Sequence, residues 1–328
     1  MRFNNHILLI YSVFVVSCSS VDIVFPREET ITQEIMPLQG ITCPFRVEVR
    51  HPFLFVENRK RTDSLFHIYD LTNYELKNAF GIKGDGPDDF VLSWLYNTQL
   101  QDILIADNSK NMLFRYSIDE EGQAVFQDVK KPSYISGVID AAFINDSLYV
   151  VDAMYLAPCL YLLSLQDDLP RKSRQYRNPA IRDYYIDPNM GNVFANESRI
   201  AFCYGYRKQI DFMDTDLNLI KSVKFKYDSP KNIQGLGDKI SYAYGYFGKR
   251  YLYVLFFGTT WREQRETTFR NTFLEVFDLD GNPVIRYRLD GIGPAYFAVD
   301  EETFTLYGAG EDGYPEDCLL VYKLKGLT

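Results

Sequence analysis

Six acidic side chains are the clearest candidates for metal chemistry in this sequence of 328 residues. They fall into two groups, one at equivalent places along an internal repeat and one inside a glycine-rich stretch: Glu57, Asp107 and Asp152, and Asp85, Asp88 and Asp89. Carboxylate oxygens are the ligands that Ca²⁺ prefers, so either group could form a calcium site. The spacing of an EF-hand is absent, and carboxylates at such places commonly cap turns by accepting backbone N–H groups. We therefore favour a structural role for these residues.

Histidine chemistry has little support in this chain. After residue 18 only His51 and His67 occur, one beside Pro52 and the other inside an apolar segment. A zinc site or a Ser-His-Asp hydrolase needs a histidine close to further ligands or to a nucleophile. We expect both histidines to be structural.

Two long segments carry aromatic and arginine side chains that suit binding. They are Trp261, Arg262 and Arg265 in one segment, and Arg182, Tyr184 and Tyr185 in the other. Aromatic rings beside arginine provide stacking surfaces for sugar rings or anchors for a protein partner. The competing interpretation, which we favour slightly, is that these rings pack the segments onto the fold.

The elements that would position these residues come from an internal repeat. One apolar motif recurs at residues 53–58, 102–108, 147–153, 199–205, 251–258 and 303–310. A second recurs at residues 65–71, 112–118, 159–165, 209–215, 273–279 and 318–324. A repeat of roughly 45–52 residues built from strand-forming segments has the period of a propeller blade. Six copies predict an all-β fold, a six-bladed β-propeller.

Each unit is predicted to contain four strands, with the two motifs as its second and third. We place the innermost strands at residues 45–50, 94–100, 138–145, 192–197, 241–248 and 295–300. Outer strands are predicted at residues 76–81, 124–129, 174–178, 220–227 and 284–289. The last unit has no outer strand of its own, because the chain stops after its third strand. Residues 31–38 are predicted to supply it, closing the ring and covering an open sheet edge.

The predicted connections differ in length between the two faces of the ring. Turns between first and second strands, such as residues 145–147, are short, and so are turns between third and fourth strands, such as residues 280–282. The opposite face carries the long segments 80–93, 179–191, 229–239 and 259–272. Because rigid scaffolds usually carry function on variable loops, this loop face is the predicted binding face.

Residues 80–90 read FGIKGDGPDDF and connect an outer strand to the next inner strand. This run resembles the G-x-x-G-x-G-P-x-x-F connection of TolB-like or NHL-like six-bladed propeller lipoproteins, found mainly in Bacteroidetes. A fragment, Gly291-Ile292-Gly293-Pro294, stands at the equivalent place before the last unit. The resemblance covers essentially the whole mature chain and implies a propeller fold and a surface location. It implies no catalytic residues. Phe90 is expected to pack between adjacent sheets.

The N-terminus is predicted to be an export signal. Arg2 precedes a short apolar run at residues 7–16, and Val15-Val16-Ser17-Cys18 resembles a bacterial lipobox. Residues 1–18 would then be a lipoprotein signal peptide ending at the lipidated Cys18, residues 19–30 a linker and residues 31–328 the propeller. An ordinary signal peptide cut near residues 17–20 is the alternative. The remaining cysteines, three of which lie in strands of different blades, are expected to be free thiols.

The formal net charge of −9 disfavours binding of phosphate backbones, so nucleic acid is excluded as a partner. The leading hypothesis is a monomeric, non-catalytic propeller, lipid-anchored in the outer membrane or cell envelope. It would bind a protein partner or a glycan through its loop face. The alternative is a divalent-cation-dependent lyase or lactonase, with calcium held by carboxylates at the central pore.

Overall fold

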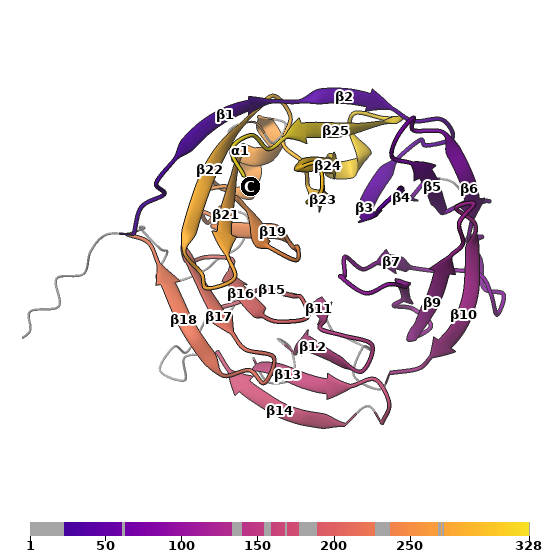
Figure 1. Cartoon of the computed structure of the whole chain (residues 1–328), viewed down its shortest axis with the longest axis horizontal. Coiled ribbons are helices and arrows are strands. Elements are labelled where there is room, and N and C mark those ends of the chain that lie inside the picture. Colours follow the sequence, from indigo (N-terminus) through magenta and orange to yellow (C-terminus); the bar gives the residue numbers. More distant parts are fainter. Residues whose placement is uncertain are drawn as a thin grey trace, which may run out of the picture.

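The computed structural model arranges the chain as six sheets radiating from a central axis (Figure 1). It describes residues 23–60, 63–132, 140–153, 159–167, 169–176, 189–226, 237–267, 270 and 272–327. The predicted six-bladed β-propeller is therefore confirmed. The signal peptide with Cys18, and Arg182, Tyr184 and Tyr185, lie outside the described residues.

Blades 1 to 4 each contain four antiparallel strands, numbered from the axis outward. Blade 1 is β3 (Pro44–Arg50), β4 (Phe53–Asn58), β5 (Phe66–Asp70) and β6 (Leu76–Phe80). Blade 2 is β7 (Ser93–Leu95), β8 (Ile103–Asp107), β9 (Met112–Ile118) and β10 (Ala124–Lys130). Blade 3 is β11 (Asp140–Phe143), β12 (Leu148–Asp152), β13 (Cys159–Ser164) and β14 (Pro170–Gln175). Blade 4 is β15 (Gly191–Ala195), β16 (Ile200–Tyr204), β17 (Gln209–Met213) and β18 (Leu219–Lys224).

Blades 5 and 6 are completed by the start of the chain. Blade 5 is β19 (Tyr242–Phe247), β20 (Tyr251–Phe256), β21 (Phe273–Asp278) and β22 (Pro283–Asp290), with β1 (Glu28–Thr32) as a fifth strand. Blade 6 is β23 (Tyr296–Asp300), β24 (Thr305–Ala309) and β25 (Cys318–Lys323), with β2 (Glu34–Pro37) outermost. The ring is thus closed by an N-terminal outer strand in the last blade, as predicted.

The closure is more extensive than the sequence indicated. β2 pairs antiparallel with β25, whereas β1 pairs parallel with β22 in the preceding blade. The predicted strand at residues 31–38 is therefore two strands in two blades, and β1 begins within the segment predicted as a linker. Figure 1 shows this indigo segment running along the outside of both blades. The fifth strand of blade 5 has no counterpart in the other blades. The four-strand repeat therefore could not predict it.

The apolar core lies between the blades and not at the axis. Strands β4, β8, β16 and β24 are buried along their whole length, because both faces of each blade pack on a neighbour. One cluster joins blade 1 to blade 2 through Phe55, Ile68 and Phe114, with Phe90 from the glycine-rich connection fully buried among them. The Phe90 ring lies 5.2 Å from Phe66 and 4.8 Å from Phe114, centroid to centroid, so the predicted role of Phe90 is confirmed.

The two faces of the ring differ as expected. One face, the turn face, carries the connections from first to second and from third to fourth strands. The other, the loop face, carries the long connections between β6 and β7 and between β20 and β21, the latter being the predicted loop at residues 259–272. That segment begins with a short helix, α1 (Trp261–Glu266), whose Thr260 and Glu263 form a capping box. Most of the predicted loops at residues 179–191 and 229–239 lies outside the described residues.

No helix of the described chain is long and apolar enough to span a bilayer. Cys43, Cys159, Cys203 and Cys318 are free thiols, as expected. Three of them are buried, where a thiol packs as a small apolar group.

Ring closure can be tested with two isoleucines of the N-terminal segment. Ile31 in β1 is 6% exposed and belongs to the core that blades 5, 6 and 1 share, whereas Ile35 in β2 is 52% exposed. Ile31→Ala should lower the free energy of unfolding by about 2–3 kcal/mol through lost burial and a residual cavity. Ile35→Ala should change it by less than about 0.5 kcal/mol. Denaturant unfolding monitored by circular dichroism measures both, and equal losses would argue against closure through β1.

Candidate functional site

Two cavities lie on the propeller axis, on either side of one crossing segment. Strand β7 is only three residues long, so the inner strand predicted at residues 94–100 ends at Leu95. The chain then crosses the ring: the Asn97 side-chain N–H donates to the Phe297 carbonyl in blade 6 at 2.8 Å. The Gln99 amide donates to the Tyr246 hydroxyl in blade 5 at 2.9 Å. Figure 1 shows this part of the chain extending from β7 into the centre of the ring.

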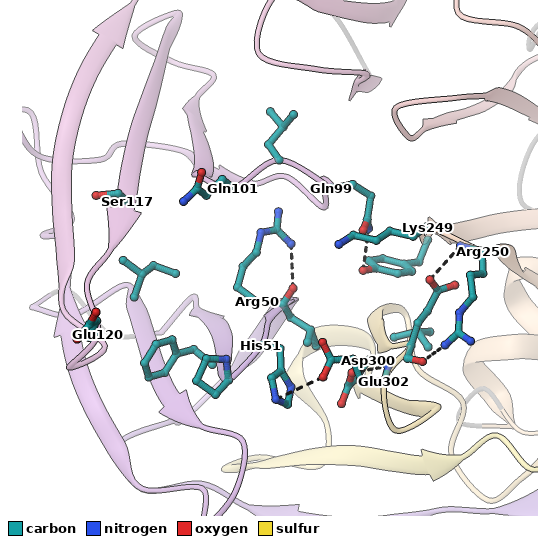
Figure 2. A pocket seen from close by; sticks show the side chains of 18 of the residues that line it. Arg50, His51, Gln99, Gln101, Ser117, Glu120, Lys249, Arg250, Asp300 and Glu302 are labelled. Carbon is teal, nitrogen blue, oxygen red and sulfur yellow. Dashed lines mark hydrogen bonds and ion pairs between the residues drawn. The ribbon is translucent and has the colours of Figure 1, made fainter. Parts of the chain in front are cut away.

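The larger cavity, called here the turn-face cavity, has a volume of about 790 Å³. Its wall comes from short turns of blades 1, 2, 5 and 6, so it opens on the face opposite to the predicted binding face. In Figure 2, Arg50 points into its middle, with Gln99 and Gln101 on one side and His51 and Glu302 on the other. The size lies within the range typical of small-molecule sites, about 300–1,000 Å³.

Arg50 lines the turn-face cavity and is held in place by two side-chain partners. Its guanidinium pairs with the fully buried carboxylate of Glu48 and donates to the Thr98 hydroxyl at 2.7 Å. Burial lowers the pKa of Arg50 to about 10, which still leaves it a cation at neutral pH. Only 14% of its side chain is exposed, so it contributes a fixed positive charge and little surface.

The acidic side chains in the cavity wall interact with neighbouring protein groups, partly across blades. Glu301 accepts from the backbone N–H of Arg250 at 3.0 Å and from the Tyr253 hydroxyl at 3.1 Å. Asp300 accepts from the Thr303 hydroxyl at 2.6 Å, and His51 Nε2 lies 3.5 Å from a Glu302 oxygen. Because these carboxylates interact with protein groups, we expect other side chains of the lining to bind a ligand.

Three polar side chains at the cavity rim are available to a ligand. Gln101, Glu120 and Lys249 are all exposed, and none makes a hydrogen bond or ion pair within the part of the chain that the structure describes. The lining also contains apolar side chains, among them Phe53 and Leu100, and this apolar part of the wall is called here the apolar floor. The Gln101 amide can donate and accept hydrogen bonds, the Glu120 carboxylate accepts them and the Lys249 ammonium donates them. Together with the apolar floor, these groups can bind a ligand that both donates and accepts hydrogen bonds.

The smaller cavity, called here the channel cavity, has a volume of about 190 Å³ and lies between the inner strands. Aromatic rings dominate its wall, among them Trp94, Tyr244 and Tyr296. The Arg46 guanidinium lies 3.3 Å from the centre of the Trp94 ring and 4.5 Å from that of Tyr296. Burial next to Tyr296 and Glu311 holds the pKa of the Tyr244 hydroxyl well above its ordinary value, so this ring stays neutral.

Four of the six acidic residues considered for calcium accept hydrogen bonds from the protein: Glu57, Asp89, Asp107 and Asp152. The Asp107 carboxylate accepts from four backbone N–H groups, those of Val91 at 2.7 Å, Leu92 at 3.4 Å, Ser109 at 2.9 Å and Lys110 at 3.1 Å. Its position next to the connection before β7 explains why an acidic residue ends strand β8.

Glu57 and Asp152 are equally buried. Glu57 accepts from the Ser93 hydroxyl at 2.8 Å and the Leu95 N–H at 3.2 Å, and burial raises its pKa despite the nearby Arg46. Asp152 accepts from the Tyr176 hydroxyl. Neither residue lines the turn-face or the channel cavity.

The acidic cluster of the glycine-rich connection does not converge on a common point. Asp89 accepts from the Gly86 N–H at 3.0 Å, while Asp85 and Asp88 are exposed. Within the described ranges, no group of three or more His, Cys, Asp or Glu side chains is placed to hold a metal ion. His67 stacks on Tyr69 within β5.

The predicted binding residues of α1 lie on the loop face. Trp261 is partly buried, with its ring 5.7 Å from Phe257 and 6.3 Å from Tyr244. Arg262 and Arg265 are exposed, and Arg265 lies 3.8 Å from Glu311. None of the three lines either axial cavity, although Tyr244 connects Trp261 to the channel wall.

Sequence reasoning missed the charged residues of the innermost strand. In β3, which reads PFRVEVR, Arg46, Glu48 and Arg50 occupy alternate positions and therefore one face of the strand. Two of them line axial cavities. The sequence does contain a signal for these residues. Charged and apolar residues alternate along this predicted inner strand, which could have indicated charged side chains near the axis.

Comparison with known proteins identifies the fold. No protein-family model and no curated protein matches the sequence. A member of the DUF4221 family from Bacteroides vulgatus superimposes with a TM-score of 0.58 at 15% identity, over 92% of this chain and 98% of that chain. A Bacteroides fragilis protein whose name describes it as exported superimposes with a TM-score of 0.59 at 9% identity, over 90% and 98%. At this identity the similarity shows the propeller fold alone.

The hydrogen bonding of Asp107 leads to a test of the calcium hypothesis. Asp107→Ala should destabilise the protein by at least about 2 kcal/mol, because buried N–H groups lose their acceptor. The matched variant Asp88→Ala, at an exposed carboxylate, should stay within about 0.5 kcal/mol of the starting protein. Thermal melts of the unsubstituted protein should coincide in micromolar calcium and in EDTA. A calcium-dependent rise in Tm that Asp107→Ala abolishes would instead favour the cation-dependent enzyme.

Proposed function

We propose that this protein is a non-catalytic, lipid-anchored envelope propeller that binds a glycan in its turn-face cavity. The observation that supports this best is the combination of Gln101, Glu120 and Lys249 above an apolar floor in a cavity of about 790 Å³. The proposed binding site therefore lies on the turn face, whereas the sequence predicted binding on the loop face.

A saccharide suits this combination because each sugar hydroxyl both donates and accepts. The carboxylate of Glu120 accepts only, the ammonium of Lys249 donates only, and the Gln101 amide does both. The C–H faces of a pyranose would lie on the apolar floor, which includes Phe53, Leu100 and Tyr246. Opposite charges around the rim disfavour a strongly ionic ligand, so a neutral or weakly charged glycan fits better than a phosphate.

The lining residues favour binding without a catalytic step. Glu301 accepts hydrogen bonds from blade 5, Asp300 accepts from Thr303 in its own turn, and Arg50 is paired with Glu48. Proton transfer needs a group that is free to reach the reacting atom. Glu120 and Lys249 are free to move a proton, but both are exposed and no hydrogen bond or ion pair among the described residues holds either in place. Binding without turnover is therefore the simpler proposal.

The envelope location rests on the lipobox and on the exported structural neighbour. Val15-Val16-Ser17-Cys18 would supply the acylated N-terminal cysteine. The residues between Cys18 and β1 would then separate the anchor from the ring, which leaves both faces of the propeller accessible to polymers of the envelope.

Glycan binding can be tested on an array of envelope oligosaccharides, with isothermal titration of each positive oligosaccharide. Gln101→Leu and Lys249→Met should each weaken the affinity by about tenfold, because a polar ligand group loses its partner. Trp261→Ala, on the loop face, should leave the affinity unchanged. An array without a positive oligosaccharide would refute the proposal, and loss of binding in Trp261→Ala alone would return the site to the loop face.

The anchor can be tested separately with Cys18→Ser. In cells fed labelled palmitate, the unsubstituted protein should carry the label and sediment with membranes, since acyl chains provide its membrane affinity. Cys18→Ser should carry no label and stay in the supernatant. An unlabelled but exported unsubstituted protein would support the ordinary signal peptide.

A further inference from the structure

We infer that the channel cavity is a second binding site, for a small neutral aromatic molecule whose ring carries a hydrogen-bond donor, as a phenol does. This inference is independent of the proposed glycan site, because the two cavities share only Tyr246 and lie on opposite sides of the crossing segment. It rests on the size of the channel cavity, on its aromatic wall and on two side-chain amides.

Small side chains of three neighbouring inner strands leave room inside the ring. β11, β15 and β19 place four alanines, a glycine and a valine in the lining of the channel cavity: Ala141, Ala142, Val193, Ala195, Ala243 and Gly245. The volume is about 190 Å³, and about 150 Å³ is enough for an apolar cavity to bind benzene. A molecule with one aromatic ring therefore fits, whereas a polymer chain or a folded partner does not fit between the inner strands.

Aromatic rings from several blades form much of the remaining wall. They include Phe194 in blade 4, Tyr244 in blade 5 and Tyr296 in blade 6. The Tyr244 and Tyr296 rings lie 4.7 Å apart, centroid to centroid, at an interplanar angle of 54°. Rings at different angles offer both faces and edges, and aromatic pairs favour offset stacking and edge-to-face contacts. Such a wall favours a flat aromatic ligand.

Among the described residues that line the channel cavity, Arg46 carries the only charge, and this charge is already engaged. Its guanidinium stacks on Trp94, donates to the Leu95 carbonyl at 3.3 Å and interacts electrostatically with the buried Glu57. A charged ligand would lose its hydration on entering the cavity without gaining a partner that is still available. The cavity therefore favours a neutral ligand.

Two side-chain amides determine which polar group the ligand carries. Asn97 and Asn192 line the cavity, and each donates one N–H to a backbone carbonyl, of Phe297 at 2.8 Å and of Ala243 at 2.9 Å. These bonds fix the amides in place, and no donor to either amide oxygen is seen among the described residues. An amide oxygen only accepts, so a hydroxyl or a ring N–H of the ligand is its matching group.

Phenol is a suitable probe, and the chain supplies its own reporter. The protein has two tryptophans, so Trp261→Phe leaves Trp94, in the channel wall, as the sole tryptophan while keeping a ring against Tyr244. Phenol should change the Trp94 fluorescence saturably, with excitation at a wavelength that phenol does not absorb.

Two analogues of phenol test the ligand class in the same variant. Toluene has nearly the same shape without the donor and should bind at least about tenfold more weakly, because an amide oxygen would be left against a methyl group. Benzoate keeps the ring and adds a charge. It should also bind at least about tenfold more weakly than phenol, because no available cation receives it.

Asparagine variants in the Trp261→Phe background locate the site. At least one of Asn97→Leu and Asn192→Leu should weaken phenol binding by about tenfold or more. Asn218→Leu removes an amide from an exposed turn of blade 4 and should leave the affinity unchanged. If neither lining variant folds, the comparison of phenol with toluene still decides. Absence of saturable phenol binding, equal affinity for toluene or benzoate, or unchanged affinity in both folded lining variants would each overturn the inference.

Discussion

The pairing of the first two strands with the last two blades is the constraint on which the rest of the molecule depends. An open propeller would expose the outer edges of β22 and β25, and exposed edges invite aggregation. β1 and β2 cover both edges, and Arg27 donates to the Gly326 carbonyl at 3.0 Å, which joins the two ends of the described chain. Blades 5 and 6 supply Lys249 and Glu302 to the turn-face cavity, so the shape of that site depends on this closure.

The crossing segment after β7 gives this ring its internal division. Inner strands of a propeller normally leave a continuous axial space, but here Asn97 and Gln99 bond to blades 6 and 5 across it. Tyr96 and Asn97 line one cavity, whereas Gln99 and Leu100 line the other. Because β7 is short, the segment after it divides the axial space into two cavities with different lining residues.

The sequence predicts the fold well because the blade is a local unit. Alternating apolar residues recur in each copy and short turns such as residues 280–282 recur in most, so strand order and blade number follow from the period. The site is harder to predict, because it is built from turns of four different blades. Gln101, Lys249 and Glu302 carry no common motif, and only the closed ring brings them together. The parallel strand β1 and the crossing segment depart from the repeat and were therefore not predictable from it.

The electrostatics of the two cavities argue that they do not serve one ligand. The turn-face cavity combines cations with several carboxylates and is open to solvent, where water screens each charge. The channel cavity is lined mainly by aromatic rings, with the Arg46 guanidinium stacked on Trp94 and coupled electrostatically to the buried Glu57. A ligand passing between them would have to break the bonds of Asn97 and Gln99 to blades 5 and 6. Tyr246 is the one residue that lines both cavities, and its hydroxyl accepts a hydrogen bond from Gln99. Any coupling between the cavities must therefore act through Tyr246 and the position of the crossing segment.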